Sequence, residues 1–436
     1  MILLPANWNP SLSFINFTYH YDLIIFVQFL MSELIWSMIF KIWICILIVL
    51  LLSLKIQAQI ESDEKPLIDI TEGITFEKDE QFKLNLRFRM QNRFGYQSTN
   101  GNPLDIKHFE ARVRRMRLRL DGYLINKNLQ YYIQLSFSRA DQNLETGVIA
   151  QTVRDAILYY QPASWVYFGF GQSKLPGNRQ RVTSSGNLQF ADRSIANLQF
   201  NIDRDFGFFS YFNIPVKGTV WNIKTAITGG EGRNANNVNN GLAYTGRIEW
   251  LPFGDFEPNT DYLEGDYTFT LKPKLSLAAT YSFNHKAVFA GGQIGNPLPE
   301  PQNLYNFISD AVFKYKGFYL LAEYFNKKAD YITYQDPVNG LLKLVPAGTG
   351  YNSQVSYCFQ NLYEPALRFA KIIPDEVQFI EALPTSEIWI GCSKYLNGHR
   401  VKVQFNLIYT WKDQLWKPDD TGNNYWGTFF QVEFGI

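Results

Sequence analysis

The fold of this chain is decided by residues 82–91, which read FKLNLRFRMQ. Apolar side chains occupy every second position, and the positions between them carry lysine, asparagine, arginine and glutamine. Successive side chains of a β-strand point to opposite faces, whereas a helix would mix the two sets. About ten residues is also the length that a tilted strand needs to cross a bilayer. The segment therefore predicts a membrane strand with one face toward lipid and the other toward water.

The same alternation recurs along the chain, at residues 129–138, 275–284 and 401–411 and in the terminal segment 426–436. Counting such segments gives about sixteen strands, and the connectors between them alternate in length. Short turns on one side and long loops on the other are typical of bacterial outer-membrane barrels, whose short turns are periplasmic. We therefore predict an all-β transmembrane antiparallel β-barrel of about 16 strands, with short periplasmic turns and long extracellular loops, located in the outer membrane of a Gram-negative bacterium.

The connectors predict where these loops lie. Short turns are expected at 125–128, 161–164, 316–317 and 396–399, and long loops at 140–153, 174–203, 229–242, 286–306, 329–350, 373–385 and 412–424. The connector between Leu251 and Leu275 breaks the alternation, because it is long on the short side.

The amino-terminal part predicts export. Residues 38–58 carry Lys41, an apolar run and a small-residue exit at Ala58, which together indicate a cleaved signal peptide. Residues 1–37 contain no lysine or arginine and are interpreted as an upstream extension or a mis-assigned start. Residues 59–81 then form a short periplasmic lead, and the barrel occupies 82–436. A retained signal anchor is the alternative, since the apolar stretch is long enough to span a membrane.

The composition agrees with such a barrel. Aromatic residues make up 16% of the chain, yet its mean hydropathy is close to that of a water-soluble protein, as expected when lipid-facing and lumen-facing positions alternate. The net charge of +1 gives no overall cationic field, so a nucleic-acid partner is not expected. Cys358 and Cys392, in the predicted barrel, have no CxxC spacing and are expected to be unpaired.

Basic residues gather at the start of the barrel. Residues 82–120 hold ten lysines and arginines against two acids. Arg115, Arg117 and Arg119 alternate with apolar residues, so a strand directs all three to one face. An arginine on the lipid face near mid-bilayer costs roughly 2–4 kcal/mol. Because five outward arginines, counting Arg87 and Arg89, would cost on the order of 10–20 kcal/mol, we expect them to line the lumen.

Arginines along a pore wall lower the barrier for anions and raise it for cations. Alternatively, they pair with acids on facing strands, such as Glu249 and Glu323, and brace the wall. Arg112 and Arg114 share the parity of lipid-facing positions, which would let them snorkel toward lipopolysaccharide phosphates. A β-bulge that turns them inward is the other possibility.

The loop 174–203 is a second source of positive charge. It contains Lys174, Arg179, Arg181 and Arg193. Folded into the barrel, it would narrow the bore and place cations at the constriction; otherwise it is a solvated external loop.

Several motifs together resemble the phosphate-selective porin O and P family, in the form found in Bacteroidetes-type bacteria. They are RRMRLRLDG at 114–122, FGFGQSKLP at 168–176, DRDFG at 203–207, TGGEG at 228–232, YTGRIEWLPFG at 244–254 and KYKGFYLLAEY at 314–324. The resemblance implies a sixteen-stranded barrel, often a homotrimer, with a constricting third loop and passive uptake of phosphate or related anions. The family's arginine ladder corresponds loosely to the arginines of the first two strands and of the 174–193 region.

We therefore predict an outer-membrane porin for small anions, whose partners are those anions and the surrounding lipid and lipopolysaccharide. The cations predicted to line the pore are Arg87, Arg89, Arg115, Arg117, Arg119, Lys174, Arg179 and Arg181. No cofactor or metal is expected, and the chain has no GxSxG elbow or other catalytic motif. The alternatives are a non-selective general diffusion porin and, with less support, an outer-membrane barrel enzyme.

Overall fold

The structure is a computed structural model. It describes residues 73–78, 81–102, 105–138, 152–235, 239, 241–258, 260–336, 340–375, 383–412 and 424–436. The predicted upstream extension and signal peptide, residues 1–58, lie outside the described residues, as does most of the predicted lead. Within the described residues, no helix is long and apolar enough to cross a membrane.

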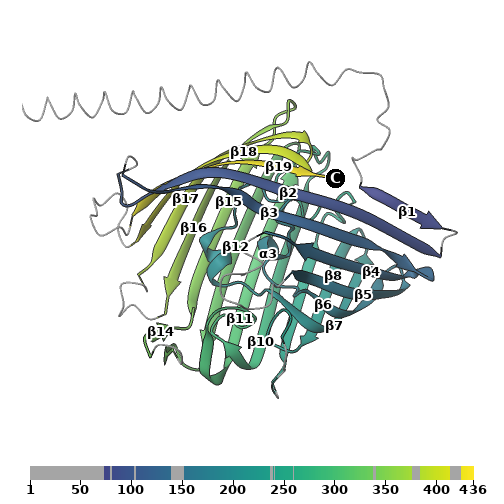
Figure 1. The fold of residues 1–436 in the computed structure, drawn as a ribbon. Coiled ribbons are helices and arrows are strands. Elements are labelled where there is room, and N and C mark those ends of the chain that lie inside the picture. Colours follow the sequence, from purple (N-terminus) through teal and green to yellow (C-terminus); the bar gives the residue numbers. More distant parts are fainter. Residues whose placement is uncertain are drawn as a thin grey trace, which may run out of the picture. The chain divides into compact units, whose positions relative to one another are not determined.

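Sixteen antiparallel strands form a closed barrel (Figure 1), which confirms the predicted fold class and strand number. The barrel strands are β2 (Phe82–Ser98), β3 (Ile106–Leu124), β4 (Asn126–Ser136), β5 (Val153–Ala163), β6 (Val166–Lys174), β7 (Arg204–Val216), β8 (Thr219–Thr228), β9 (Ala243–Leu251), β10 (Lys274–Phe289), β11 (Pro297–Tyr315), β12 (Phe318–Ala329), β15 (Gly348–Tyr357), β16 (Tyr363–Pro374), β17 (Thr385–Asn397), β18 (Val401–Lys412) and β19 (Tyr425–Gly435). Each pairs with the next along the chain, and β19 pairs with β2 to close the ring.

The two faces of the strands differ as the periodicity predicts. In β2, Gln91 and Arg93 are buried on the lumen side, whereas Phe94 is 55% exposed on the outer face. In β19, Glu433 is buried and Phe434 is exposed. Alternate positions of each strand face water and lipid, so the polar side chains of the barrel point inward.

The edge of β2 opposite β3 is shared by two strands. β19 pairs with β2 as far as Arg89, where Gly435 is its last paired residue, and the N–H of Ile436 donates to the carbonyl of Phe88 at 2.9 Å. The short strand β1 (Ile74–Lys78) continues this edge, pairing with β2 from Leu86 to Phe82. Part of the predicted lead is therefore a strand, and Figure 1 shows it alongside the start of β2.

Two of the connector predictions need correction. β10 extends to Phe289 and β11 begins at Pro297, so the predicted loop 286–306 is reduced to residues 290–296. The two strands still pair at Ala287 and Gln302, beyond the length needed to cross the bilayer. The 329–350 connector holds a small hairpin of β13 (Thr333–Gln335) and β14 (Leu342–Leu344).

Two connectors from opposite ends fold into the barrel. The inner loop, residues 175–203, contains the helices α3 (Arg179–Val182) and α4 (Ile195–Gln199), and Figure 1 shows α3 within the ring of strands. Leu175, Phe200 and Ile202 of this loop pack in an apolar cluster with wall residues such as Phe209. The folded-in alternative for this loop is confirmed. Residues 252–273, here called the periplasmic connector after the orientation expected from the sequence, enter from the short-turn side, where Lys314 of β11 binds the carbonyls of Thr260 and Leu263. Their place inside the barrel explains why this connector is long where the neighbouring turns are short.

Candidate functional site: a cation-lined lumen

In the first two barrel strands, β2 and β3, arginines lie directly opposite one another. Arg87 lies directly across from Arg119, and Arg89 across from Arg117. Like charges at such positions are destabilising. Their presence on the lumen face therefore indicates that positive charge at this wall serves a purpose other than stability.

Neutral and acidic groups hold these guanidinium groups in place. Arg89 donates to the hydroxyls of Ser184 and Ser185 in the inner loop, at 3.1 and 2.8 Å, and lies 3.5 Å from a carboxylate oxygen of Glu433. Arg117 donates to the Ser185 hydroxyl at 3.0 Å. The wall and the inner loop are thus connected through the arginines themselves.

A β-bulge adds one further arginine to this wall. Gln91 pairs with Arg115 and Asn92 with Val113, so Arg114 is an extra residue in β3. Its guanidinium reaches Asp192 of the inner loop at 3.3 Å. The inward alternative therefore holds for Arg114.

The same shift of register changes the face of Arg112. This residue lies opposite Arg93, whose side chain points inward. The hypothesis that Arg112 and Arg114 face lipopolysaccharide was wrong, because the bulge reverses the parity on which it relied.

Gly186 is needed where the inner loop meets this wall. A Cβ at this position would lie 2.0 Å from a guanidinium nitrogen of Arg89 and 2.6 Å from a carboxylate oxygen of Glu433. Any larger residue would displace one of these groups. The absence of a side chain at position 186 allows Arg89 to pass close to the loop backbone.

Two aspartates of the inner loop balance part of the positive charge. Asp192 lies within 2.5 Å of Arg93 and 3.4 Å of Arg115. Burial opposes its ionisation, but the charges of Arg93 and the neighbouring arginines hold its pKa below the ordinary value.

Asp203 is held in the same way at the other end of the loop. It pairs with Arg181 at 2.5 Å and with Arg204 at 3.5 Å. Their charges lower its pKa against the effect of burial. Both aspartates are therefore ionised at neutral pH.

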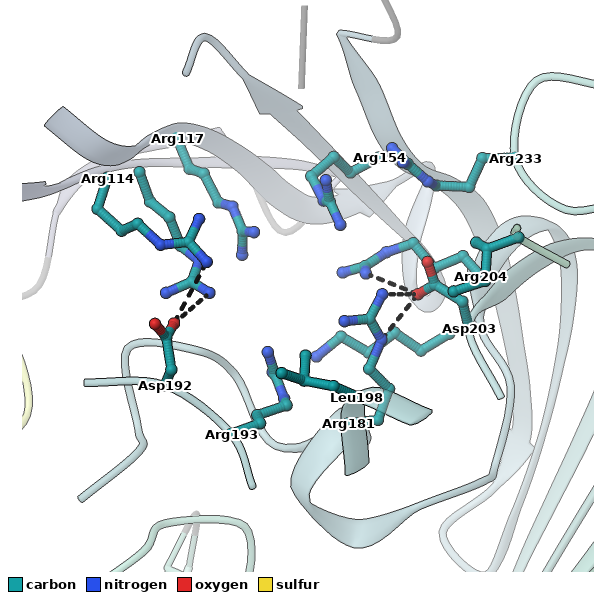
Figure 2. A pocket seen from close by; sticks show the side chains of 13 residues that line it. Arg114, Arg117, Arg154, Arg181, Asp192, Arg193, Leu198, Asp203, Arg204 and Arg233 are labelled. Atoms are coloured by element: carbon teal, nitrogen blue, oxygen red, sulfur yellow. Dashed lines mark hydrogen bonds and ion pairs between the residues drawn. The ribbon is translucent and has the colours of Figure 1, made fainter. Parts of the chain in front are cut away.

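These side chains surround a cavity of about 310 Å³ on the long-loop side of the lumen, here called the loop-side cavity. Its lining residues are Arg114, Arg115, Arg117, Arg154, Lys174, Arg181, Asp192, Arg193, Leu198, Asp203, Arg204, Arg233 and Ile294. Nine of them are cations and two are acids. Figure 2 shows the guanidinium groups converging on this space from β3 on one side and from the inner loop on the other.

A second cavity of about 980 Å³, the turn-side cavity, opens toward the short turns. Its cations include Arg87, Arg89 and Arg119, and Tyr132 and Tyr262 contribute aromatic rings. Arg117 and Lys174 line both cavities. The two cavities therefore meet at these two residues, and positive charge continues from one side of the lumen to the other.

Three cations near this meeting point have only neutral partners among the described residues. Arg117 bonds to a serine hydroxyl, Lys174 to the carbonyl of Val182 at 2.6 Å, and Arg193 to the carbonyls of Gln180 and Thr183 at 2.6 and 2.8 Å. Burial and the adjacent Arg181 lower the pKa of Arg193 well below its ordinary value. An anion at this point would supply the negative charge that these three groups lack.

Arg179 does not belong to this site. Its side chain is buried, bonding to Asp310 and Asp261 at 2.9 Å each, and it lies outside the lining of both cavities. Its charge is balanced by these two acids, so a direct role for Arg179 in lining the pore stays a prediction. Its position on the loop was inferred correctly, but the facing acids that neutralise it are distant in sequence.

Ion pairs link the lumen-facing side chains of strands β8 to β11. Glu249 pairs with Lys224 at 2.8 Å and with Arg247 at 2.6 Å, and Arg247 also pairs with Asp310. Glu323 accepts from the backbone N–H of Gln180 at 3.1 Å. The alternative of wall-bracing ion pairs therefore applies to Glu249 and its partners, whereas Glu323 anchors the inner loop.

The structure brings together Arg87, Arg89, Arg115, Arg117, Arg119, Lys174 and Arg181 around the two cavities. The predicted set omitted five arginines: Arg114, Arg154, Arg193, Arg204 and Arg233. Arg114 and Arg154 lie at register shifts, where the period of two is interrupted. Arg204 could have been found, because it stands within the DRDFG motif that follows the inner loop.

The chain is similar in sequence to a known family of porins. The sequence profile of the family described as phosphate-selective porin O and P matches residues 82–286. The predicted family resemblance is confirmed. The matched porin segment contains every charged residue of the loop-side cavity. A comparison with curated proteins gives no significant match in sequence.

Two solved porins share the fold. The OmpF porin of Salmonella typhi, in complex with daunomycin, is 14% identical over 83% of this chain and 100% of its own, with a TM-score of 0.55. An anion-selective porin from Comamonas acidovorans is 13% identical over 81% of this chain and 99% of its own, with a TM-score of 0.52. The chain thus has the barrel of outer-membrane porins, and the family and fold support an outer-membrane channel rather than an enzyme.

Proposed function

We propose that this porin is a passive diffusion channel that favours small anions, with phosphate or related oxyanions as its solutes. The observation that carries the proposal is the junction of the two cavities, where Arg117, Lys174 and Arg193 have no carboxylate partner among the described residues. Fixed charge at a constriction focuses the field and raises the local concentration of counter-ions.

The chemistry of the lining favours oxyanions. A guanidinium group presents forked N–H donors that match the oxygens of phosphate or carboxylate, in addition to its charge. Because arginines follow one another from Arg115 through Arg117 to Arg119, an anion leaving one group meets the next. Conduction requires such a series of sites, each weak enough to release the ion.

The proposal extends to the setting of the channel. We infer that the barrel lies in the outer membrane with its short turns in the periplasm, in contact with lipid and lipopolysaccharide, and that it forms a homotrimer. The fold supports the first inference, and the resemblance to the porin family supports the second.

Ion selectivity in planar bilayers tests the proposal. Purified protein under a potassium chloride gradient should give a reversal potential whose sign shows that chloride is more permeant than potassium. Added phosphate should reduce the chloride current. A reversal potential near zero with no effect of phosphate would instead identify a non-selective general porin and overturn the proposal.

A further inference from the structure

The periplasmic connector is fixed to the barrel wall. Its Phe256 packs with Val220 and Leu321 in an apolar cluster of the wall. Farther along, Lys314 of β11 donates to the carbonyls of Thr260 and Leu263 at 2.9 Å each. Residues 260–264 are therefore held inside the lumen by side chains of the barrel.

The same segment binds the backbone of the inner loop. The Glu264 N–H donates to the carbonyl of Asn187 at 2.9 Å, and one Glu264 carboxylate oxygen accepts from the Gln189 N–H at 2.9 Å. The other carboxylate oxygen accepts from the Gln180 side chain at 2.9 Å. Glu264 is only 2% exposed, so water does not compete for these bonds.

A second point of contact surrounds Arg179. The Tyr262 ring lies 4.5 Å from the centre of its guanidinium group, and Asp261 binds the same group. The Tyr262 hydroxyl donates to Glu249 on β9 and accepts from Lys224 at 2.9 Å. Loop, connector and wall thus share one network of contacts.

The inner loop depends on such support. Its helices, α3 and α4, have four and five residues, and isolated helices of that length are unstable in water. The carbonyls of Gln180 and Thr183, which hold Arg193, belong to the segment that the connector binds. A shift of this segment would move both the constriction and its cations.

We propose that Glu264 and Tyr262 are positioning residues, through which the periplasmic connector fixes the inner loop and thereby sets the bore and the selectivity of the channel. The connector acts from the periplasmic end on a loop that starts at the opposite end. The size of the largest permeating solute is thus determined by this contact as well as by the width of the barrel.

The test compares Glu264→Ala with Glu257→Ala, a matched change at an exposed acid of the same connector. Swelling of liposomes in neutral sugars of increasing size measures the bore, and planar bilayers measure conductance and reversal potential. Migration of unheated and heated samples on gels reports whether the barrel is folded. We expect Glu264→Ala to admit larger sugars and to conduct about two- to threefold more, because a sixteen-stranded barrel is wide once its lumen is cleared. Its reversal potential should move toward zero.

Two conservative variants complete the design. Glu264→Gln keeps one acceptor oxygen and should have an intermediate effect, and Tyr262→Phe keeps the ring while removing the hydroxyl bonds. If Glu264→Ala does not fold, Glu264→Gln and Tyr262→Phe test the proposal by the same measurements of bore and reversal potential. A folded Glu264 variant with the sugar limit and reversal potential of Glu257→Ala would overturn the proposal. Since neutral sugars report the bore alone, this outcome is independent of whether the channel prefers anions.

Discussion

Substitution of Arg117 is the sharpest test of the anion pathway, because this residue lines both cavities. Arg117→Gln removes one positive charge while retaining a polar side chain. A unit charge acts on an anion about 4 Å away with about 1 kcal/mol in water and about 4 kcal/mol at an effective dielectric constant of about 20. The lumen is wet, so we expect a loss of about 1–2 kcal/mol, which corresponds to a roughly 5- to 30-fold weaker interaction with phosphate.

The assay is the phosphate concentration that halves the chloride current through single channels, read together with the reversal potential. Arg117→Lys keeps the charge and should lie close to the wild type. Arg112→Gln is the matched control, since Arg112 lies on the same strand, has a largely exposed side chain paired with Glu110, and lines neither cavity. Equal half-blocking concentrations for Arg117→Gln and Arg112→Gln would refute the reasoning.

Three further changes test the structure around the site. Arg179→Gln removes one of the two ion pairs of the buried Asp310, which keeps its pair with Arg247, so we expect a loss of about 1.5–3 kcal/mol in stability, seen as unfolding at a lower temperature on heat-modification gels. Unchanged heat resistance would contradict the burial of this ion pair. Gly186→Ala should displace Arg89 and alter single-channel conductance, whereas a wild-type conductance would show that the loop accommodates a methyl group. The pKa of Asp192 is lowered in the folded protein, so its contribution to stability is present above its unfolded pKa of about 3.9 and is lost as pH falls through the folded value. Thermal unfolding of Asp192→Asn should therefore depend less on acid pH than that of the wild type, and parallel curves would disprove the ion pair.

The period of two in the sequence was sufficient to predict the barrel and the inward direction of most of its arginines. The lipid face excludes charge strongly, so Arg87, Arg89, Arg115, Arg117 and Arg119 had one acceptable direction. This inference depends only on local alternation and on the bilayer. It therefore required no knowledge of which strands become neighbours.

Contacts between distant segments could not be predicted in this way. The neutralisation of Arg179 depends on Asp310, which is 131 positions away, and the sequence offers no sign of that pairing. The direction of Arg114 stayed open and Arg154 was missed, because a bulge adds a residue to one strand and reverses the alternation locally. The inward folding of residues 252–273 could not be predicted either, since the length of a connector does not indicate where it folds.

The strand β1 makes the wall complete at the place where β19 stops. Its five residues satisfy backbone groups of β2 that would otherwise form an unpaired edge, and such edges recruit strands from other chains. Deleting residues 73–78 would leave the sixteen barrel strands intact while exposing an unpaired strand edge of β2 at the short-turn end of the barrel. We therefore expect versions of the protein that lack this strand to associate through the exposed edge more readily than versions that begin before it.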